Sequence, residues 1–265
     1  MTTLTYALGD SATMLRRNLK RAVRYPALTV LVAGMPVVFL LLFVFVFGGT
    51  LGAGLGGATA GRAEYVNFVT PGILLIGVAS AAQGTAIAVA MDMNEGIIAR
   101  FRTMSIARGS VLTGHVLSSL IQTMLGLAII LGVALLVGFR PTATAAEWIS
   151  VVGVLAMATF ALVWLSVAMG LAAKTVESAS NMPMLLVLLP FFGSGFVPTD
   201  SMPAGLRAFA EYQPFTPVMD TLRGLLLGGP IGTSAVLAVA WCAGISAVGW
   251  IWARRRYERR PARQP

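Results

Sequence analysis

The stretch VVFLLLFVFVF, residues 37–47, decides the fold class. It ends a run from Ala27 to Phe47 that holds no charged side chain. A helix needs about 20 apolar residues to cross a hydrocarbon core roughly 30 Å thick, and this run supplies them. The apolar residues are continuous rather than alternating, which excludes a membrane β-barrel. Of the whole chain 57% is hydrophobic and 11% is charged, whereas a soluble domain carries about a quarter charged residues. We therefore predict an all-α integral membrane protein.

Further apolar runs predict six transmembrane helices in a single domain that covers residues 1–265. The predicted spans are about 27–47, 67–90, 111–138, 148–173, 181–198 and 231–252. The fifth is short and contains Pro183 and Pro190, so we expect it to pack inside the bundle rather than to cross as one straight helix. The first run is longer than the apolar region of a signal peptide, so we expect it to be retained as a span.

The distribution of basic residues predicts the orientation of the spans. Fifteen of the nineteen Lys and Arg residues lie in the N-terminal stretch, in every second connecting segment and in the C-terminal tail. The positive-inside rule places these segments, and both termini, in the cytoplasm. The net charge of +9 is therefore a topology signal, and we expect no nucleic-acid partner.

One charged stretch, MDMNEGIIARFRTMSIARGS at residues 91–110, interrupts the apolar chain between the second and third spans. Its apolar residues recur at helical spacing, with Glu95 and Arg102 on the opposite side. An amphipathic helix lying on the lipid explains the pattern, and so does a helix that docks a soluble cytoplasmic protein. The N-terminal stretch MLRRNLKRAVRYP, residues 14–26, similarly predicts a basic amphipathic helix at a surface of anionic lipid.

The stretch EYQPFTPVMDTLRGLLLGG, residues 211–229, is predicted to lie on the outer side. Thr216 is placed to cap a helix that begins at Pro217. Asp220 and Arg223 are three residues apart, so they can form an ion pair. An apolar helix here either folds back into the bilayer as a half-span or rests on the bundle surface.

Catalytic and metal-binding motifs are missing from the sequence. The single histidine and single cysteine exclude the HExxH zinc motif and a metal site built from thiols and imidazoles. The segment FFGSGF lacks the G-x-S-x-G nucleophile elbow, and no Walker A phosphate loop is present. We expect no enzymatic activity and no cofactor in this chain.

The carboxylates also argue against an ion-driven secondary transporter, which usually buries them near the middle of the membrane. Here Asp92, Glu95, Glu147 and Glu177 all lie at the ends of predicted spans. We expect the energy for transport to come from another protein.

With this layout, MNEGIIARFRTMSIARGSVLTGHV (93–116) and QPFTPVMDTLRGLL (213–226) resemble the ABC-2 family of transporter permeases, and in particular the daunorubicin/doxorubicin-resistance type of drug exporter. The resemblance implies a half-transporter that pairs with a second permease copy or a homologous permease. It also implies a separate cytoplasmic ATP-binding cassette subunit, which would hold ATP and magnesium.

The resemblance assigns roles to three groups of residues. A coupling helix that contacts the ATPase would include Asp92, Glu95, Ile98, Arg100, Phe101, Arg102 and Met104. An N-terminal helix lying along the membrane would include Arg16, Arg17, Lys20, Arg21 and Arg24. Re-entrant helices before the last span would include Pro214, Phe215, Pro217, Asp220 and Arg223.

The resemblance further implies a hydrophobic or amphipathic substrate, either drug-like or lipid, moved out of the cytoplasm or inner leaflet of a bacterial cell membrane. Our candidates for the substrate path are Phe39, Phe43, Gln83, Gln122, Asn181, Phe191 and Phe192. Lipid or polysaccharide export is the main alternative. An ion-coupled secondary transporter and a membrane enzyme or assembly factor are the others.

Overall fold

The computed structural model describes residues 13, 15–18, 20, 26–56, 61–95 and 108–259. Over those residues every regular element is a helix and no strand occurs. The predicted all-α class is therefore confirmed.

Five helices among the described residues are long and apolar enough to cross a membrane, so the chain is a multi-pass membrane protein. They coincide with the first four predicted spans and the sixth. The first is continuous through α2 (Pro26–Leu42), η1 (Phe43–Phe47) and α3 (Gly48–Gly56); the others are α4 (Arg62–Asn94), α6 (Arg108–Val137), α7 (Ala145–Ala172) and α12 (Ser234–Arg259).

The predicted fifth span is broken, as its prolines suggest. Three short helices replace it, namely α8 (Val176–Asn181), α9 (Met184–Leu188) and η2 (Leu189–Phe192). Pro183 precedes α9 and Pro190 lies in the first turn of η2. Proline lacks the backbone N–H that a continuous helix requires, so each one ends the regular hydrogen-bond ladder. This segment is therefore not one of the five long helices.

The chain from Val176 to Phe196, which we call the broken segment, nevertheless runs beside α4. In the second half of α4 the Gln83 side chain donates from Nε2 to the Ser180 carbonyl (2.8 Å), and near the start of α4 the Tyr65 hydroxyl donates to the Phe196 carbonyl (3.5 Å). Two residues of a helix that are 18 positions apart are separated by about 27 Å. The distance from Ser180 to Phe196 is thus close to the roughly 30 Å thickness of a bilayer core.

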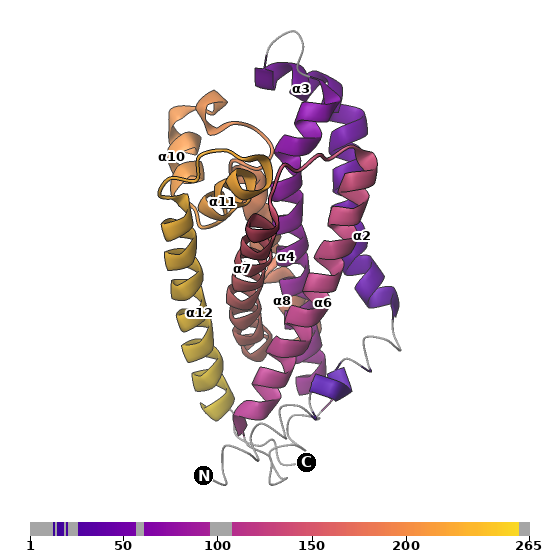
Figure 1. Cartoon of the computed structure of the whole chain (residues 1–265). Helices are drawn as coiled ribbons and strands as arrows, with labels where there is room; N and C mark the ends of the chain where they lie inside the picture. The colour runs from indigo at the N-terminus through magenta and orange to yellow at the C-terminus, as the bar shows by residue number, and fades with distance from the viewer. Residues whose placement is uncertain are drawn as a thin grey trace.

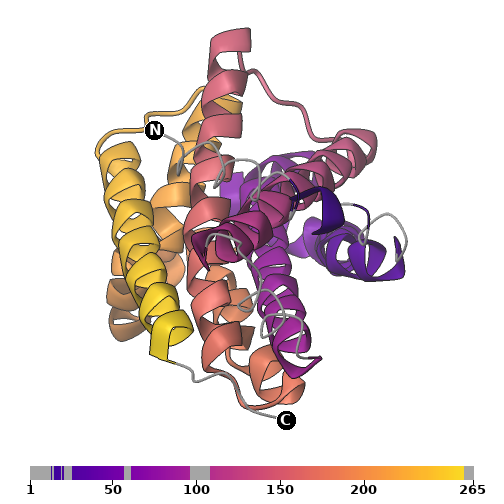
Figure 2. The same ribbon diagram turned by 90° about the horizontal axis from the view of Figure 1, so that it is seen from below.

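Helices α4 and α7 form the centre of the bundle. We compared the most apolar 18 residues of each long helix. Of these residues, 67% are buried in α4 and 61% in α7, against 17% in α12 and 22% in both α6 and the first span. In Figure 1 α12, α7 and α4 lie in that order across the bundle, with α6 and α2 beyond α4; Figure 2 shows α12 and α2 on opposite flanks. The outer faces of the flanking helices are apolar and exposed, as lipid contact requires.

Glycines allow the central helices to approach closely. A Cβ atom at Gly170 of α7 would lie 2.6 Å from the Ala86 carbonyl oxygen of α4. A Cβ atom at Gly249 of α12 would lie 2.6 Å from the Leu165 amide nitrogen of α7. Small residues at such contacts are typical of membrane helices, where close packing replaces the hydrophobic effect as the main attraction.

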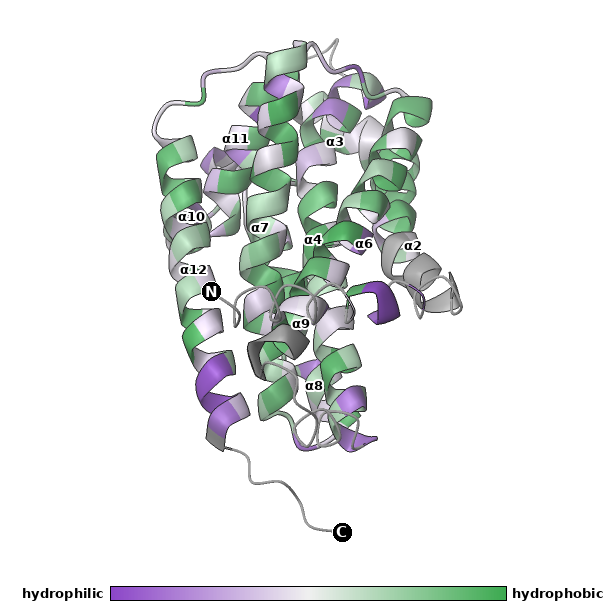
Figure 3. Cartoon of the chain, turned by 60° about the horizontal axis from the view of Figure 1, so that its bottom comes forward, coloured by the Kyte–Doolittle hydropathy of each residue, from purple (hydrophilic) through white to green (hydrophobic). Residues whose placement is uncertain are grey.

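The two ends of the bundle differ in structure. One end carries η3 (Thr199–Ser201), α10 (Ala204–Tyr212) and α11 (Phe215–Leu227), and α11 stops at Gly228, whose φ of 75° suits a glycine C-cap. At the opposite end, α12 finishes in the polar turns that contain Arg254, Arg255 and Arg256 (Figure 3). We refer to these as the α10–α11 end and the arginine end.

Candidate functional site

The predicted coupling helix is only partly within the described residues. Ile98, Arg100, Phe101, Arg102 and Met104 lie outside them, as do Arg21 and Arg24 of the predicted N-terminal helix. Glu95 is exposed directly after α4, where its amide donates to the Met91 carbonyl (2.9 Å). Arg16 and Lys20 are exposed on the helical residues near the N-terminus.

Asp92 points into the protein rather than toward solvent. It lies in the last turn of α4 with 0% of its surface exposed. Its Oδ2 atom lies 3.4 Å from a guanidinium nitrogen of Arg17 and 3.2 Å from Nε2 of His115 in α6. A buried carboxylate needs such partners, because the loss of hydration is otherwise uncompensated.

We call Arg17, Asp92 and His115 the Asp92 group. It connects three segments at the arginine end. These are the N-terminal helical residues, the end of α4 and the start of α6. Arg17 and Asp92 are 75 positions apart in sequence, and no local pattern indicates that they meet.

Three of the predicted path residues do come together. Phe39 and Phe43 of the first span both pack against Phe191 of η2, with ring centroids 5.5 Å and 6.3 Å from it. Phe196, which the sequence did not single out, completes the group: its ring lies 4.7 Å from Phe43 and is stacked on Phe191 at 4.8 Å. We call Phe39, Phe43, Phe191 and Phe196 the phenylalanine cluster.

The other predicted path residues lie elsewhere. Phe192 packs against Phe209 of α10, with ring centroids 6.5 Å apart. Gln122 donates from Nε2 to the Ser118 carbonyl of its own helix (3.1 Å). Gln83 holds the broken segment at Ser180, and the adjacent Asn181 is exposed. The Gln83 and Gln122 amides thus bond to backbone groups rather than joining the phenylalanine cluster.

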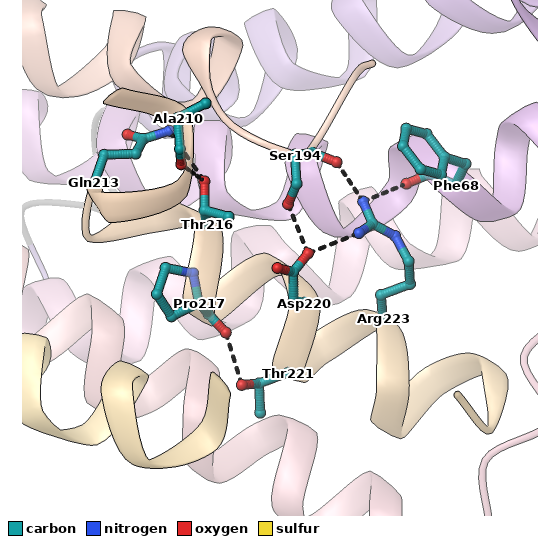
Figure 4. A network of polar contacts seen from close by, with 9 residues as sticks. All are labelled: Phe68, Ser194, Ala210, Gln213, Thr216, Pro217, Asp220, Thr221 and Arg223. Atoms are coloured by element: carbon teal, nitrogen blue, oxygen red, sulfur yellow. Dashed lines mark hydrogen bonds and ion pairs between the residues drawn. The ribbon is translucent and has the colours of Figure 1, made fainter. Parts of the chain in front are cut away.

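The predicted Asp220–Arg223 ion pair is present in α11, with a nitrogen–oxygen distance of 2.9 Å (Figure 4). The same Oδ1 atom of Asp220 accepts a hydrogen bond from the Ser194 hydroxyl (2.6 Å). The other terminal nitrogen of Arg223 donates to the Ser194 carbonyl (2.6 Å), and the guanidinium lies 4.3 Å from the centre of the Phe68 ring. We call Ser194, Asp220 and Arg223 the Arg223 network.

The start of α11 differs from the prediction. The helix begins at Phe215, and Pro214 occupies the N-cap position with φ −65° and ψ −23°. Proline already holds a helical φ, so the helix starts two residues earlier than Pro217. Thr216 does not cap it; its hydroxyl donates to the Ala210 carbonyl of α10 (2.5 Å) and joins the two short helices. Phe215 and Pro217 are both buried.

Residues 11–227 match the family described as ABC-2 type transporter. The chain belongs to this family. The ABC-2 chain is also 26% identical over 243 residues to the daunorubicin resistance ABC transporter permease protein DrrB1 of Streptomyces coeruleorubidus, a match that covers 91% of this chain and 83% of that protein.

A second similarity is to the probable doxorubicin resistance ABC transporter permease protein DrrC of Mycobacterium tuberculosis. The two are 30% identical over 156 residues, which is 58% of this chain and 55% of DrrC. The resemblance stated from the sequence is confirmed, and this ABC-2 chain is the membrane permease of an ABC exporter.

Proposed function

We propose that this permease exports a hydrophobic or amphipathic compound, drug-like or lipid, from the cytoplasm or inner leaflet. The phenylalanine cluster is the observation that carries the substrate class. It joins the first span to the broken segment, and aromatic rings offer large apolar surfaces with favourable edge and face contacts. The relatives named for daunorubicin and doxorubicin resistance favour a drug-like compound.

Six crossings are proposed, with the broken segment as the fifth. It begins beside the part of α4 near the arginine end and reaches the α10–α11 end, so α12 then returns across the membrane. The arginine-rich end of α12 would face the cytoplasm by the positive-inside rule. The proposed location is a bacterial cytoplasmic membrane with both termini inside.

Energy would come from a separate ATP-binding cassette subunit that holds ATP and magnesium. Among the described residues the carboxylates of the long helices lie in their end turns, at Glu64, Asp92, Glu147 and Glu258. This placement supports an external energy source over an ion gradient. Residues 92–104 and the basic N-terminal residues would contact the ATPase, and the Asp92 group would transmit movement to α4 and α6.

A second permease copy would complete the transporter. The first span and the broken segment both present exposed apolar side chains, including Val46 (63% exposed) and Leu185 (70% exposed). We place the contact between the two copies on these faces, so that the two phenylalanine clusters approach each other. The bound substrate would then lie between the permease units.

The proposal is tested by purifying the permease from native membranes in mild detergent and identifying bound proteins by mass. Wild type is compared with Glu95→Arg and Arg102→Glu. A bound ATPase that is retained by wild type and lost from the charge reversals supports coupling through this segment. Permease that purifies without any ATPase and transports on an ion gradient would instead establish a secondary transporter.

Substrate class is measured on the reconstituted complex. ATP-dependent uptake of doxorubicin into inverted vesicles is compared with transfer of a fluorescent phospholipid between leaflets. Uptake of doxorubicin alone supports the drug branch, and transfer of phospholipid alone supports lipid export. The absence of both would contradict the proposed substrate class.

A further inference from the structure

The Arg223 network includes one residue, Ser194, of a short turn that connects the broken segment to the α10–α11 end. Gly193, Ser194 and Gly195 form this turn, directly after η2. It is held from one side by α4 and from the other by α11. A Cβ atom at Gly195 would lie 2.8 Å from the sulfur of Met219 in α11 and 3.1 Å from the Gly72 Cα of α4. The turn therefore fits between the two helices only because it carries almost no side chains.

Every strong polar contact of the turn in Figure 4 goes to α11. The Ser194 hydroxyl donates to Asp220, and its carbonyl accepts from Arg223. Arg223 also donates to the Phe68 carbonyl of α4 at a longer distance, 3.5 Å. One side chain thus joins α11, the turn and α4.

The turn also fixes the phenylalanine cluster. Phe191 lies three positions before Ser194 and Phe196 two positions after it, and their rings stack on each other at 4.8 Å. Displacing Ser194 from Asp220 and Arg223 would move both ring-bearing residues, because only one or two backbone units separate them from the turn. The polar network and the aromatic cluster therefore change position together.

The ion pair is placed where it can open at moderate cost. The side chains of Asp220 and Arg223 are 36% and 22% exposed, so the protein does not fully enclose either of them. A pair buried without access to water would lose several kcal/mol per ion on separation.

We infer that the Arg223 network is a lock at the α10–α11 end, which opens in each transport cycle and thereby rearranges the phenylalanine cluster for substrate release. Asp220, Arg223 and Ser194 are positioning residues in this scheme and do not contact the substrate. The inference rests on the proposed export function. A permanently structural network would instead stay closed throughout the cycle.

The test is a reversible covalent bridge across the lock in the complex with its ATPase. Ser194→Cys and Asp220→Cys are introduced together in a Cys242→Ser background, and the two thiols are joined with a short bifunctional methanethiosulfonate reagent. We expect ATP-driven uptake of the substrate to be lost on bridging and restored by reduction. Unchanged uptake by the bridged protein would overturn the lock.

A matched control bridges another ion pair at the same end. Arg207 of α10 and Asp200 of η3 lie 2.7 Å apart on the exposed surface, and neither contacts the turn. Arg207→Cys with Asp200→Cys should transport equally before and after bridging. Loss of uptake in this control as well would mean that any bridge at this end blocks transport, which would overturn the specific role of Arg223.

A second measurement does not depend on the bridge. Ser194→Cys alone is labelled with a membrane-impermeant thiol reagent in the presence and absence of ATP. The lock predicts faster labelling during ATP turnover, and equal labelling rates would contradict it. If the unmodified complex shows no ATP-driven uptake at all, the proposed export function fails. That result differs from uptake that is present and unchanged by the bridge, which would overturn only the lock.

Discussion

Asp92 and Asp220 are each held by an arginine, at opposite ends of the bundle. Asp92 contacts Arg17 and His115, while Asp220 contacts Arg223 and Ser194. Carboxylates near a membrane are costly unless paired, and such pairs are often functional. At the scale of single residues, one carboxylate–arginine pair thus lies at each end of the bundle.

Asp92→Asn is expected to weaken the contact between the N-terminal helix and the start of α6. Hydrogen bonds to a charged group contribute about 1.5–3 kcal/mol, and loss of the carboxylate charge also leaves Arg17 with less compensation. We expect a lower melting temperature of the purified complex and a smaller stimulation of its ATPase activity by substrate.

Glu64→Gln is the control for that substitution. Glu64 is an exposed carboxylate in the first turn of the same helix. It should leave both the melting temperature and the stimulation unchanged. Equal behaviour of Asp92→Asn and Glu64→Gln would show that Asp92 has no part in coupling.

Phe191→Ala should weaken substrate binding. Phe191 contacts three other rings of the phenylalanine cluster, and each aromatic pair is worth about 0.5–1.5 kcal/mol beyond its buried area. We expect a several-fold rise in the concentration of doxorubicin that half-saturates ATPase stimulation. Phe160→Ala, on α7 and 39% exposed, should leave that concentration unchanged. The same shift in both variants would argue against a substrate role for the cluster.

At the scale of elements, the long helices could be predicted because each is a continuous apolar run. The break in the fifth span was also predictable, since Pro183 and Pro190 remove backbone donors. The pairing of Asp220 with Arg223 followed from their spacing on one helix. The partners of that pair, Ser194 and Phe68, could not be predicted, because helical periodicity defines the faces of one helix but not its register against another.

The glycine contact between α12 and α7 gives a prediction at this scale. Gly249→Val would force the two helices apart, since even a Cβ atom would lie 2.6 Å from backbone. Overpacking of this kind costs about 1–3 kcal/mol. We expect less monodisperse protein by size-exclusion chromatography and a lower melting temperature. On the same helix, a Cβ atom at Gly244 would meet nothing within 4 Å, so Gly244→Val should behave as wild type, and similar losses in both would refute the packing argument.

At the scale of the whole molecule, the number of crossings determines where the C-terminal arginines lie. With six crossings, Gly205 of α10 faces outside and Glu258 of α12 faces inside. With the N-terminus inside, both assignments would reverse if the broken segment did not cross. Its path beside α4 from Gln83 to Tyr65 favours the six-crossing arrangement.

This is tested by single cysteines in a Cys242→Ser background. Gly205→Cys should react with an impermeant maleimide added to intact cells, and Glu258→Cys should react only after the cells are opened. The reverse pattern would contradict the proposed orientation, in which α10 faces outside and the end of α12 faces inside. The basic residues of the sequence predict this same orientation. The number of crossings, however, depends on the path of the broken segment, which the sequence does not determine.

The close approach of α12 to α7 at Gly249, and of α7 to α4 at Gly170, has a mechanical consequence. With backbones this close, α4, α7 and α12 have little freedom to slide or rotate against one another. They are expected to move as one rigid body. The first span is joined to this rigid body through side chains. It also contains the π-helical turn of η1, which is a common site of local adjustment. Shape change during transport should therefore fall on the first span, the broken segment and α11, while α4, α7 and α12 move together as one rigid body.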